Sequence, residues 1–325
     1  MPRSAMSLWL ACLLALLLPV QVTRAADYPV RPVTLVTAFT PGGPSDLLAR
    51  IVGQRLSEIL HQPFVVDGRP GGGGNIAAEF VARATPDGYT LLLGNNSILA
   101  TNMSLYKKLG YDARRDFAPI ALIGSQANIL VVGPRVHANA MSELIALAKA
   151  NPGKLNYAST GYGAAAHLSA ELFKRDAGVD IVMVPYKGAG PALQDLMAGQ
   201  VDMVFATAAS VIGHIRSGAL RPLAVTTAKR TTLLPDVATV AELGIPGFEA
   251  TTWHGLVAPA GTPKDIINTL NRATIEALKD PNVRKSLTDL GVDIAGSSPE
   301  EFAAYIRLEI PKWAAVIAAS GAQVE

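Results

Sequence analysis

Residues 33–60 constrain the fold of this chain more than any other segment. Residues 33–39 form an apolar run typical of a strand, residues 40–44 contain two glycines and two prolines, and a helix is expected to open at Ser45 and Asp46. The first backbone N–H groups of such a helix have no partner within it, and they attract anions to the space beyond the strand. The segment therefore predicts an α/β unit with an anion site.

A second unit of the same kind follows at residues 155–173. Residues 155–159 are expected to form a strand, Gly161 and Gly163 lie in the loop, and a helix follows from Ala164. Glycine lets the backbone approach a ligand closely and adopt positive φ. Two such loops predict two lobes that close on a small carboxylate.

The first 25 residues have the three parts of a secretory signal peptide. Arg3 gives a positive start, residues 8–20 are apolar, and Thr23-Arg24-Ala25 offers a small-x-small cleavage site. The apolar core is shorter than the ~20 residues that span a bilayer as a helix. Cys12 lies inside the apolar run and not after it, which argues against a lipid anchor. We therefore expect residues 1–25 to be removed and the mature protein to lie in the periplasm.

The mature chain is expected to be near neutral and free of cysteine. Arg3 and Arg24 leave with the signal peptide, so 26 basic and 26 acidic residues remain. This balance argues against nucleic acid or an anionic membrane as the partner. The mature length exceeds what one core usually serves, so two lobes are expected.

Candidate strands and helices alternate along the chain, which predicts an α/β fold with mostly parallel sheets flanked by helices. Strands are expected at residues 33–39, 64–67, 90–93, 129–132, 155–159, 181–184, 201–205, 223–226 and 255–258. Helices are expected at residues 46–60, 75–84, 141–150, 164–175, 189–198, 265–279, 281–290 and 299–320.

The order of these elements predicts one lobe built from two separate stretches. Residues 26–125 and 233–325 are expected to form the first lobe, and residues 126–232 the second. The chain would cross near residues 120–129 and again after Thr226.

The glycine run at residues 71–74 resembles part of a dinucleotide-binding fingerprint. Gly72, Gly74 and Ala77 have the relaxed spacing, but the next strand ends in Gly94-Asn95-Asn96 and lacks the acid that would hold a ribose. The sequence predicts no cofactor.

Polar residues that follow predicted strands are candidate ligand contacts. Asn95, Asn96 and Ser97 follow one strand, and Ser159 and Thr160 end another. Short amide and hydroxyl groups can donate to a carboxylate, but they also serve as turn and cap residues.

Asp46 has two interpretations. An acid in the first turn of a helix complements the helix dipole. In a carboxylate pocket its charge would repel the ligand, so it would instead orient loop amides or bind an amine or hydroxyl.

Catalysis and metal binding find little support in the sequence. There is no GxSxG motif, and the five histidines show no metal-binding spacing. His167 follows the second glycine loop, where it faces either the ligand or the core. We expect no enzyme activity and no metal.

Several motifs in order resemble the Bug family of periplasmic solute-binding proteins, the receptors of tripartite tricarboxylate transporters. The matching segments are FTPGGPSD at residues 39–46, GGGGNIAAE at 71–79, PDGYTLL at 86–92, NPGKLNYAST at 151–160, VPYKGAGPALQDLMAGQVD at 184–202, LRPLAVTTAKR at 220–230, LPDVATVAELG at 234–244 and WHGLVAPAGTP at 253–263. The resemblance implies a two-lobed type II periplasmic binding fold with the ligand between the lobes.

The resemblance also implies which residues hold the ligand, mainly through loop amides and hydroxyls. The implied contacts are Phe39, Thr40, Gly42, Gly43, Asp46, Asn95, Asn96, Ser97, Ser159, Thr160, Gly161 and Gly163, with Phe205, Ala206 and Thr207 as a further candidate wall. Ala164 and His167 are added as candidates because they follow the second glycine loop. Ala164 stands where many members have serine, and Thr40 where proline is frequent, so selectivity is expected to differ.

We expect a monomer, and the resemblance implies that it hands its ligand to membrane permease subunits. A sensor that docks on a signalling receptor and a periplasmic hydrolase are the alternatives. No arginine lies in the predicted binding loops to demand a second carboxylate, which favours a small or aromatic monocarboxylate.

Overall fold

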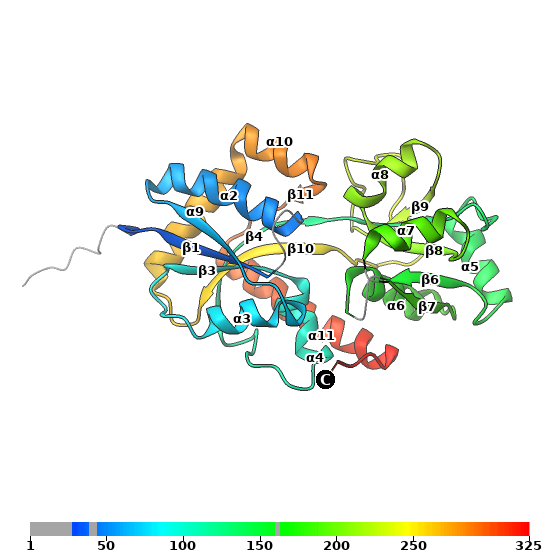
Figure 1. Cartoon of the computed structure of the whole chain (residues 1–325), viewed down its shortest axis with the longest axis horizontal. Helices are drawn as coiled ribbons and strands as arrows, with labels where there is room; N and C mark the ends of the chain where they lie inside the picture. Colours follow the sequence, from blue (N-terminus) through cyan, green and yellow to red (C-terminus); the bar gives the residue numbers. More distant parts are fainter. Residues whose placement is uncertain (1–27, 39–43, 160–162, 187, 325) are drawn as a thin grey trace, which may run out of the picture.

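Two mixed β-sheets, each flanked by helices, lie beside one another along the long axis of the molecule (Figure 1). The structure is a computed structural model that describes residues 28–38, 44–159, 163–186 and 188–324. The α/β, two-lobed fold expected from the sequence is confirmed.

The six-stranded sheet forms the first lobe. Strand β1 pairs in parallel with β2 and β3, and β10 pairs antiparallel with β3 and β4. In spatial order the strands are β11 (Val292–Ile294), β4 (Phe117–Gln126), β10 (Thr252–Pro259), β3 (Thr90–Asn95), β1 (Val33–Thr37) and β2 (Phe64–Gly68).

The five-stranded sheet forms the second lobe. Strand β6 pairs in parallel with β7 and β8, whereas β5 pairs antiparallel with β8 and β9. The spatial order is β7 (Val182–Pro185), β6 (Asn156–Ser159), β8 (Met203–Thr207), β5 (Asn128–Val132) and β9 (Arg221–Val225).

The expectation of mostly parallel sheets is correct only for the strands away from the connections between the lobes. The chain leaves the first sheet along β4, passes through Ala127 into β5, and returns along β10 beside β4. Because β4 and β10 carry the chain in opposite directions, they pair antiparallel. Strand β4 was not expected from the sequence, although it is the longest strand of the described chain.

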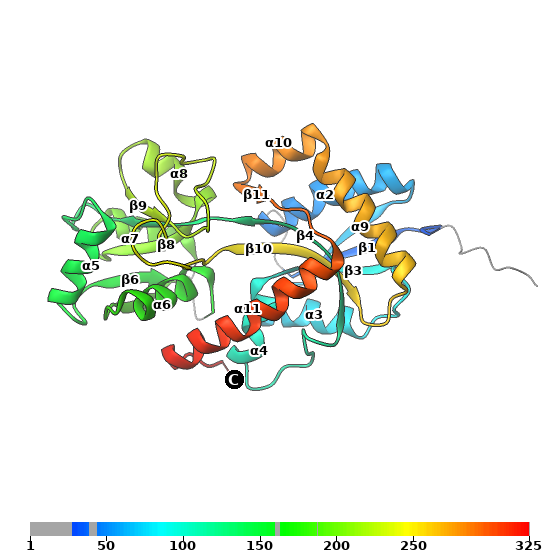
Figure 2. The same ribbon diagram turned by 180° about the vertical axis from the view of Figure 1, so that it is seen from behind.

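Helices cover both faces of each sheet (Figures 1 and 2). The longer helices are α2 (Pro44–Leu60), α3 (Asn75–Ala82), α5 (Met141–Ala150), α6 (Ala165–Ala177), α7 (Ala189–Met197), α8 (Ala208–Arg216), α9 (Lys264–Lys279), α10 (Pro281–Asp289) and α11 (Pro299–Ser320). Shorter turns are the 3-10 turn η1 (Gly72–Gly74), the π turn η2 (Ser97–Thr101) and α4 (Asn102–Leu105). No helix among the described residues is both long enough and apolar enough to cross a membrane.

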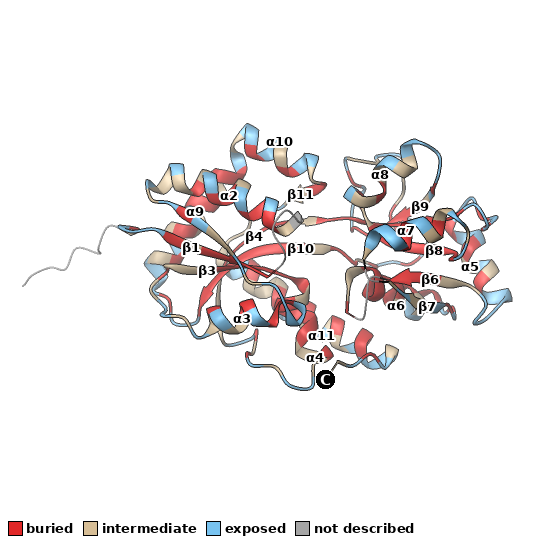
Figure 3. Ribbon diagram, viewed as in Figure 1, coloured by how far each residue is buried: buried red, intermediate tan, exposed pale blue. Residues whose placement is uncertain are grey.

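Alternate strand residues enter different cores, as the twofold period of a strand requires. Leu91 and Leu93 pack into the core below α2 and α9, whereas Leu92 belongs to the core on the opposite face. Figure 3 shows the strands buried and the outer faces of the helices exposed. Trp313 of α11 and Phe173 of α6 belong to the same core as Leu92. Helix α11 therefore packs against both lobes.

The segment before β10 lies against the second sheet. The Val225 N–H donates to Ala238 O at 3.0 Å, the Val240 N–H to Val225 O at 2.9 Å, and the Ala250 N–H to Thr226 O at 2.9 Å. These bonds hold residues 238–250 beside the end of β9, and the chain re-enters the first sheet at Thr252.

Candidate functional site

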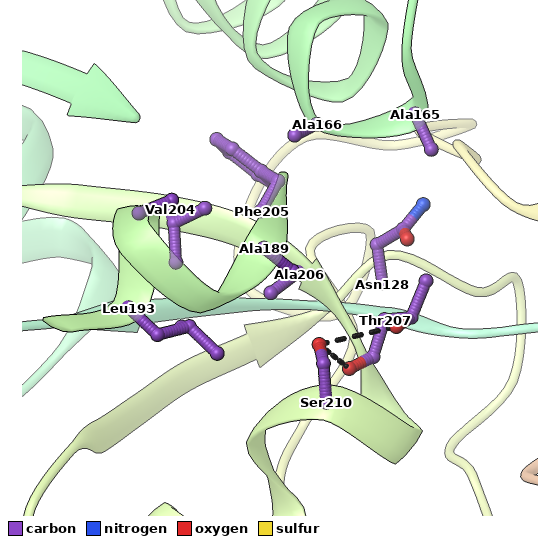
Figure 4. Close-up of a pocket in the computed structure, with 11 residues that line it drawn as sticks. Asn128, Ala165, Ala166, Ala189, Leu193, Val204, Phe205, Ala206, Thr207 and Ser210 are labelled. Carbon is purple, nitrogen blue, oxygen red and sulfur yellow. Dashed lines mark hydrogen bonds between the residues drawn. The ribbon is translucent and has the colours of Figure 1, made fainter. Parts of the chain in front are cut away.

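A cavity of about 150 Å³ lies in the second lobe, where three parallel strands end (Figure 4). Strands β6, β7 and β8 are followed by α6, α7 and α8, whose first turns all border the cavity. None of the lining residues carries a charge; they are Asn128, Ala165, Ala166, Ala189, Ala192, Leu193, Val204, Phe205, Ala206, Thr207 and Ser210. The cavity is apolar in its walls and bordered by helix starts.

The start of α6 shows how the second glycine loop is arranged. Ala164 is the N-cap, with φ −66° and ψ 158°, and its side chain makes no cap hydrogen bond. Gly163 has φ +73°, which favours glycine, and its backbone lies against Leu105 of α4. The missing hydroxyl at Ala164 therefore leaves α6 without a side-chain cap.

His167 lies beneath this loop and not in the open cavity. The Gly163 N–H donates to His167 Nδ1 at 3.1 Å, and the imidazole is buried. Burial lowers the pKa of His167 below its usual range, with a smaller opposing effect from Glu171. The neutral ring accepts a hydrogen bond from the Gly163 N–H and thereby holds the turn in place. Contact between His167 and a ligand stays a prediction.

Thr207 and Ser210 supply the hydroxyl groups at the start of α8. The Thr207 hydroxyl donates to Ser210 Oγ at 3.1 Å, and the Ser210 hydroxyl donates to Thr207 O at 2.8 Å. Phe205 is fully buried and packs against Phe173, with ring centroids 5.6 Å apart. The predicted wall from Phe205 to Thr207 thus lines the cavity, and the sequence did not predict α8 or Ser210.

In the first lobe, Asp46 lies in the first turn of α2 and pairs with Arg50 on the same helix. Arg50 Nε donates to Asp46 Oδ2 at 2.9 Å, and Nη2 donates to Oδ1 at 3.1 Å. Asp46 is buried, whereas the Arg50 side chain is about half exposed. A buried carboxylate that is paired with Arg50 in the first helical turn fits the interpretation in which Asp46 stabilises the start of α2.

Asn95, Asn96 and Ser97 lie at the corresponding end of the first sheet. Asn95 Oδ1 accepts from the Ile98 N–H at 3.2 Å, so this side chain bonds to the backbone of the turn η2. Asn96 Oδ1 is buried without a hydrogen-bond partner among the described residues, and Ser97 is partly exposed. The structure gives Asn95 a role in the turn and leaves ligand contact by all three as a prediction.

His254 and Ser45 form a contact that the sequence did not predict. His254 lies on β10, and its Nε2 is 2.9 Å from Ser45 Oγ near the start of α2. Burial lowers the pKa of His254 from 6.5 to about 4. Nearly 210 residues separate the two in sequence, so only the pairing of β10 beside β3 brings them together.

Several predicted contacts lie outside the described residues, namely Phe39, Thr40, Gly42, Gly43, Thr160 and Gly161. Ser159 is described and is fully buried at the end of β6. Within the described ranges, no three histidine, cysteine or acidic side chains are grouped so that they could hold a metal ion.

The receptor profile of the tripartite tricarboxylate transporter family matches residues 48–322 of the chain. The chain belongs to this family. The family consists of transporter binding proteins and not of enzymes.

Similar proteins of this receptor family cover almost the whole chain. Protein BugT of Bordetella pertussis is 39% identical over 93% of each chain. An R. palustris protein solved with adipate is 40% identical, with a TM-score of 0.78 over 92% of this chain and 100% of that one. MatC of Rhodopseudomonas palustris, solved with bound malate, is 35% identical, with a TM-score of 0.75 over 89% of this chain and 100% of that one. The resemblance to the Bug family and the periplasmic binding fold is therefore confirmed.

Proposed function

We propose that this receptor captures a small organic carboxylate between its two lobes in the periplasm and delivers it to the membrane subunits of a tripartite transporter. The observation that carries the proposal is the cavity where α6, α7 and α8 begin, which faces the lobe that contains α2. In both overall views the first turn of α2 points toward the second lobe (Figures 1 and 2).

Helix starts suit a carboxylate better than they suit any other common ligand group. A carboxylate only accepts hydrogen bonds, and the first turn of each helix supplies N–H donors together with the positive end of the helix dipole. The lining residues add no anion that would oppose binding. A charge-assisted hydrogen bond contributes about 1.5–3 kcal/mol, so a few such bonds support a Kd of about 1 µM or tighter.

The apolar walls of the cavity favour a carboxylate with a short hydrocarbon body. Ala165, Ala192, Leu193 and Val204 line it beside the hydroxyls of Thr207 and Ser210. Two relatives were solved with dicarboxylates, adipate and malate. These relatives favour a diacid of four to six carbons over the monocarboxylate that the lack of arginine indicated.

We also propose that the lobes divide at Ala127 and near Thr251. Residues 238–250 hydrogen-bond beside β9, which supports a later return crossing than the boundary expected after residue 232. The export signal expected in residues 1–25 lies outside the described residues, and export remains part of this proposal. Sequencing the N-terminus of the protein from a periplasmic extract should give Ala26 as the first residue.

A binding screen tests the function. The mature protein would be unfolded, refolded to remove bound ligand, and titrated calorimetrically with adipate, malate, succinate, benzoate, acetate and glutamate. We expect one class of acid to bind near 1 µM and to be recovered unchanged, and the protein to elute as a monomer. Millimolar binding of every acid would contradict the proposal.

A further inference from the structure

The imidazole of His254 is buried below the start of α2, on the same face of the sheet as Leu256. Only 2% of the residue is exposed. Its neighbours across the sheet are Asn95 on β3 and Gly124 on β4, and neither is ionisable. Its one side-chain hydrogen bond within the described chain joins Nε2 to Ser45 Oγ, and Nδ1 is buried without a partner there.

The unpartnered Nδ1 indicates which ring nitrogen carries the proton. If Ser45 donated to a bare Nε2, the neutral ring would carry its hydrogen on Nδ1, as a buried N–H with no acceptor. If Nε2–H donates to Ser45 Oγ, Nδ1 is only an unused acceptor. Orphaned buried N–H groups are rarer in proteins than under-used acceptors, so the second arrangement is favoured.

The second arrangement changes what Ser45 offers to a ligand. Its Oγ is then occupied as an acceptor by Nε2–H, and its own proton remains to be donated. Ser45 is the second residue of α2, a helix of 17 residues whose first N–H groups have no partner within the helix. The Ser45 side chain has no other hydrogen bond among the described residues.

We propose that His254 is a positioning residue for the carboxylate site, which holds Ser45 as a donor at the start of α2. Nε2–H binds Oγ, and the hydroxyl proton is directed away from the ring toward an anion at the helix start. The Asp46 carboxylate in the same turn is paired with Arg50, which offsets its repulsion of that anion. The inference rests on the proposed function, since it adds a side-chain donor from the first lobe to the same ligand. Because His254 lies on β10, this donor is attached to the strand that connects the two lobes.

Calorimetric titration of six variants tests the coupling between His254 and Ser45. Adipate and malate are the probes, and the variants are Ser45→Ala, His254→Met, the double variant of both, His254→Gln, Ser210→Ala, and Ser210→Ala combined with His254→Met. A hydrogen bond to a charged group is worth about 1.5–3 kcal/mol, so Ser45→Ala is expected to weaken binding about tenfold or more. His254→Met should weaken binding to a similar extent.

The double variant separates positioning from a merely structural role. If His254 acts through Ser45, the double variant binds no more weakly than Ser45→Ala alone. His254→Gln places an amide N–H near Nε2 and should restore most of the affinity. Ser210 lies in the other lobe, so its effect should multiply with that of His254→Met.

Two titration results would overturn the inference while the wild-type protein still binds acid. One is a His254→Met variant that is folded and binds like wild type, and the other is multiplication of the Ser45→Ala and His254→Met effects. Nitrogen NMR of the unliganded wild type tests the tautomer independently of any ligand, and a protonated Nδ1 would overturn it too. Failure of the wild type to bind any acid would instead contradict the proposed function.

Discussion

Each lobe contains a buried histidine beside a helix start, and the two histidines do different things. In the second lobe, His167 accepts a hydrogen bond from the backbone of Gly163, and the cavity is bordered by helix starts and apolar side chains. In the first lobe, His254 contacts the side chain of Ser45. In the proposed function, the second lobe would therefore bind its ligand through backbone donors and shape, whereas the first lobe would add a side-chain hydrogen bond whose geometry depends on a tautomer.

This difference means that the two half-sites should fail in different ways. A cavity of fixed shape is sensitive to added volume and insensitive to protonation. A histidine-supported hydroxyl is sensitive to loss of its partner and to proton uptake by the ring. The following predictions test the comparison, beginning with the largest effect.

Filling the cavity of the second lobe should weaken ligand binding more than any other change. Ala165→Phe places a benzyl group in a cavity of about 150 Å³, and a ~150 Å³ apolar cavity is about filled by one benzene. We expect affinity for the best acid to fall at least about 100-fold, or about 2.7 kcal/mol, by calorimetry. Ala146→Phe, on the exposed face of α5, is the matched control and should bind normally.

Unchanged affinity in Ala165→Phe would show that the ligand does not use this cavity. The melting temperature should change little, because Ala165 is only partly buried at the first position of α6. A large decrease in melting temperature would therefore mean that binding is lost through unfolding and not through filling of the cavity.

Acid should destabilise the protein through His254. Its pKa is lowered from 6.5 to about 4 in the fold, so the unfolded chain binds more protons between these values. The free energy of unfolding is therefore at its maximum above about pH 6.5, as far as His254 is concerned. It decreases by about 3 kcal/mol as the pH falls to 4 and below. His167, whose pKa is also lowered by burial, adds a loss of the same sign.

Urea unfolding at a series of pH values measures this dependence. His254→Gln should remove most of the loss, and His167→Gln should remove a part of it. An unfolding free energy that is as pH-dependent in the double glutamine variant as in wild type would assign the effect to other groups.

A side chain at Gly163, where the two lobes are in contact, should destabilise the protein. Gly163 has φ +73°, and a Cβ there would overlap the Leu105 side chain. Gly163→Ala should lower the free energy of unfolding by about 2–3 kcal/mol, from backbone strain of about 1–2 kcal/mol and from the overlap.

Gly178→Ala is the matched control for this substitution. Gly178 also has positive φ, at +62°, but apart from its neighbours in the chain no described residue has an atom within 4 Å of the position that a Cβ would take there. Gly178→Ala should lower the free energy of unfolding by only about 1–2 kcal/mol. Equal losses at the two glycines in urea unfolding would mean that the lobes are not in close contact at Leu105.

The sequence predicted the local units of the site better than it predicted how they come together. Apolar runs and glycine loops were enough to place β1, β6 and α6, because these are local features. Strand β4 lies in a stretch with no clear helix pattern, and α8 follows β8 without a turn. Strand β4 was missed because its buried residues do not alternate, and α8 because no proline or glycine separates it from β8.

The contact of Ser45 with His254 could not be predicted from the sequence for a different reason. It depends on β10 returning between β3 and β4, a long-range pairing that no local pattern encodes. For the same reason the cavity residues from β5 and α8, Asn128 and Ser210, were not predicted, whereas Phe205 and Thr207 were.

The smallest effect should come from placing at Ala164 the serine that the family resemblance implies there. The residue is an N-cap with extended backbone and no side-chain cap, so Ala164→Ser should stabilise the fold by about 0.5–1 kcal/mol. Ala140, the N-cap of α5, has the same features far from the cavity. Ala140→Ser should give a similar gain in urea unfolding and leave acid binding unchanged. Ala164→Ser should also alter the ratio of the affinities for malate and adipate, because its hydroxyl adds a donor beside the cavity. If Ala164→Ser changes the stability but not this ratio, the second lobe recognises its ligand through backbone donors and shape.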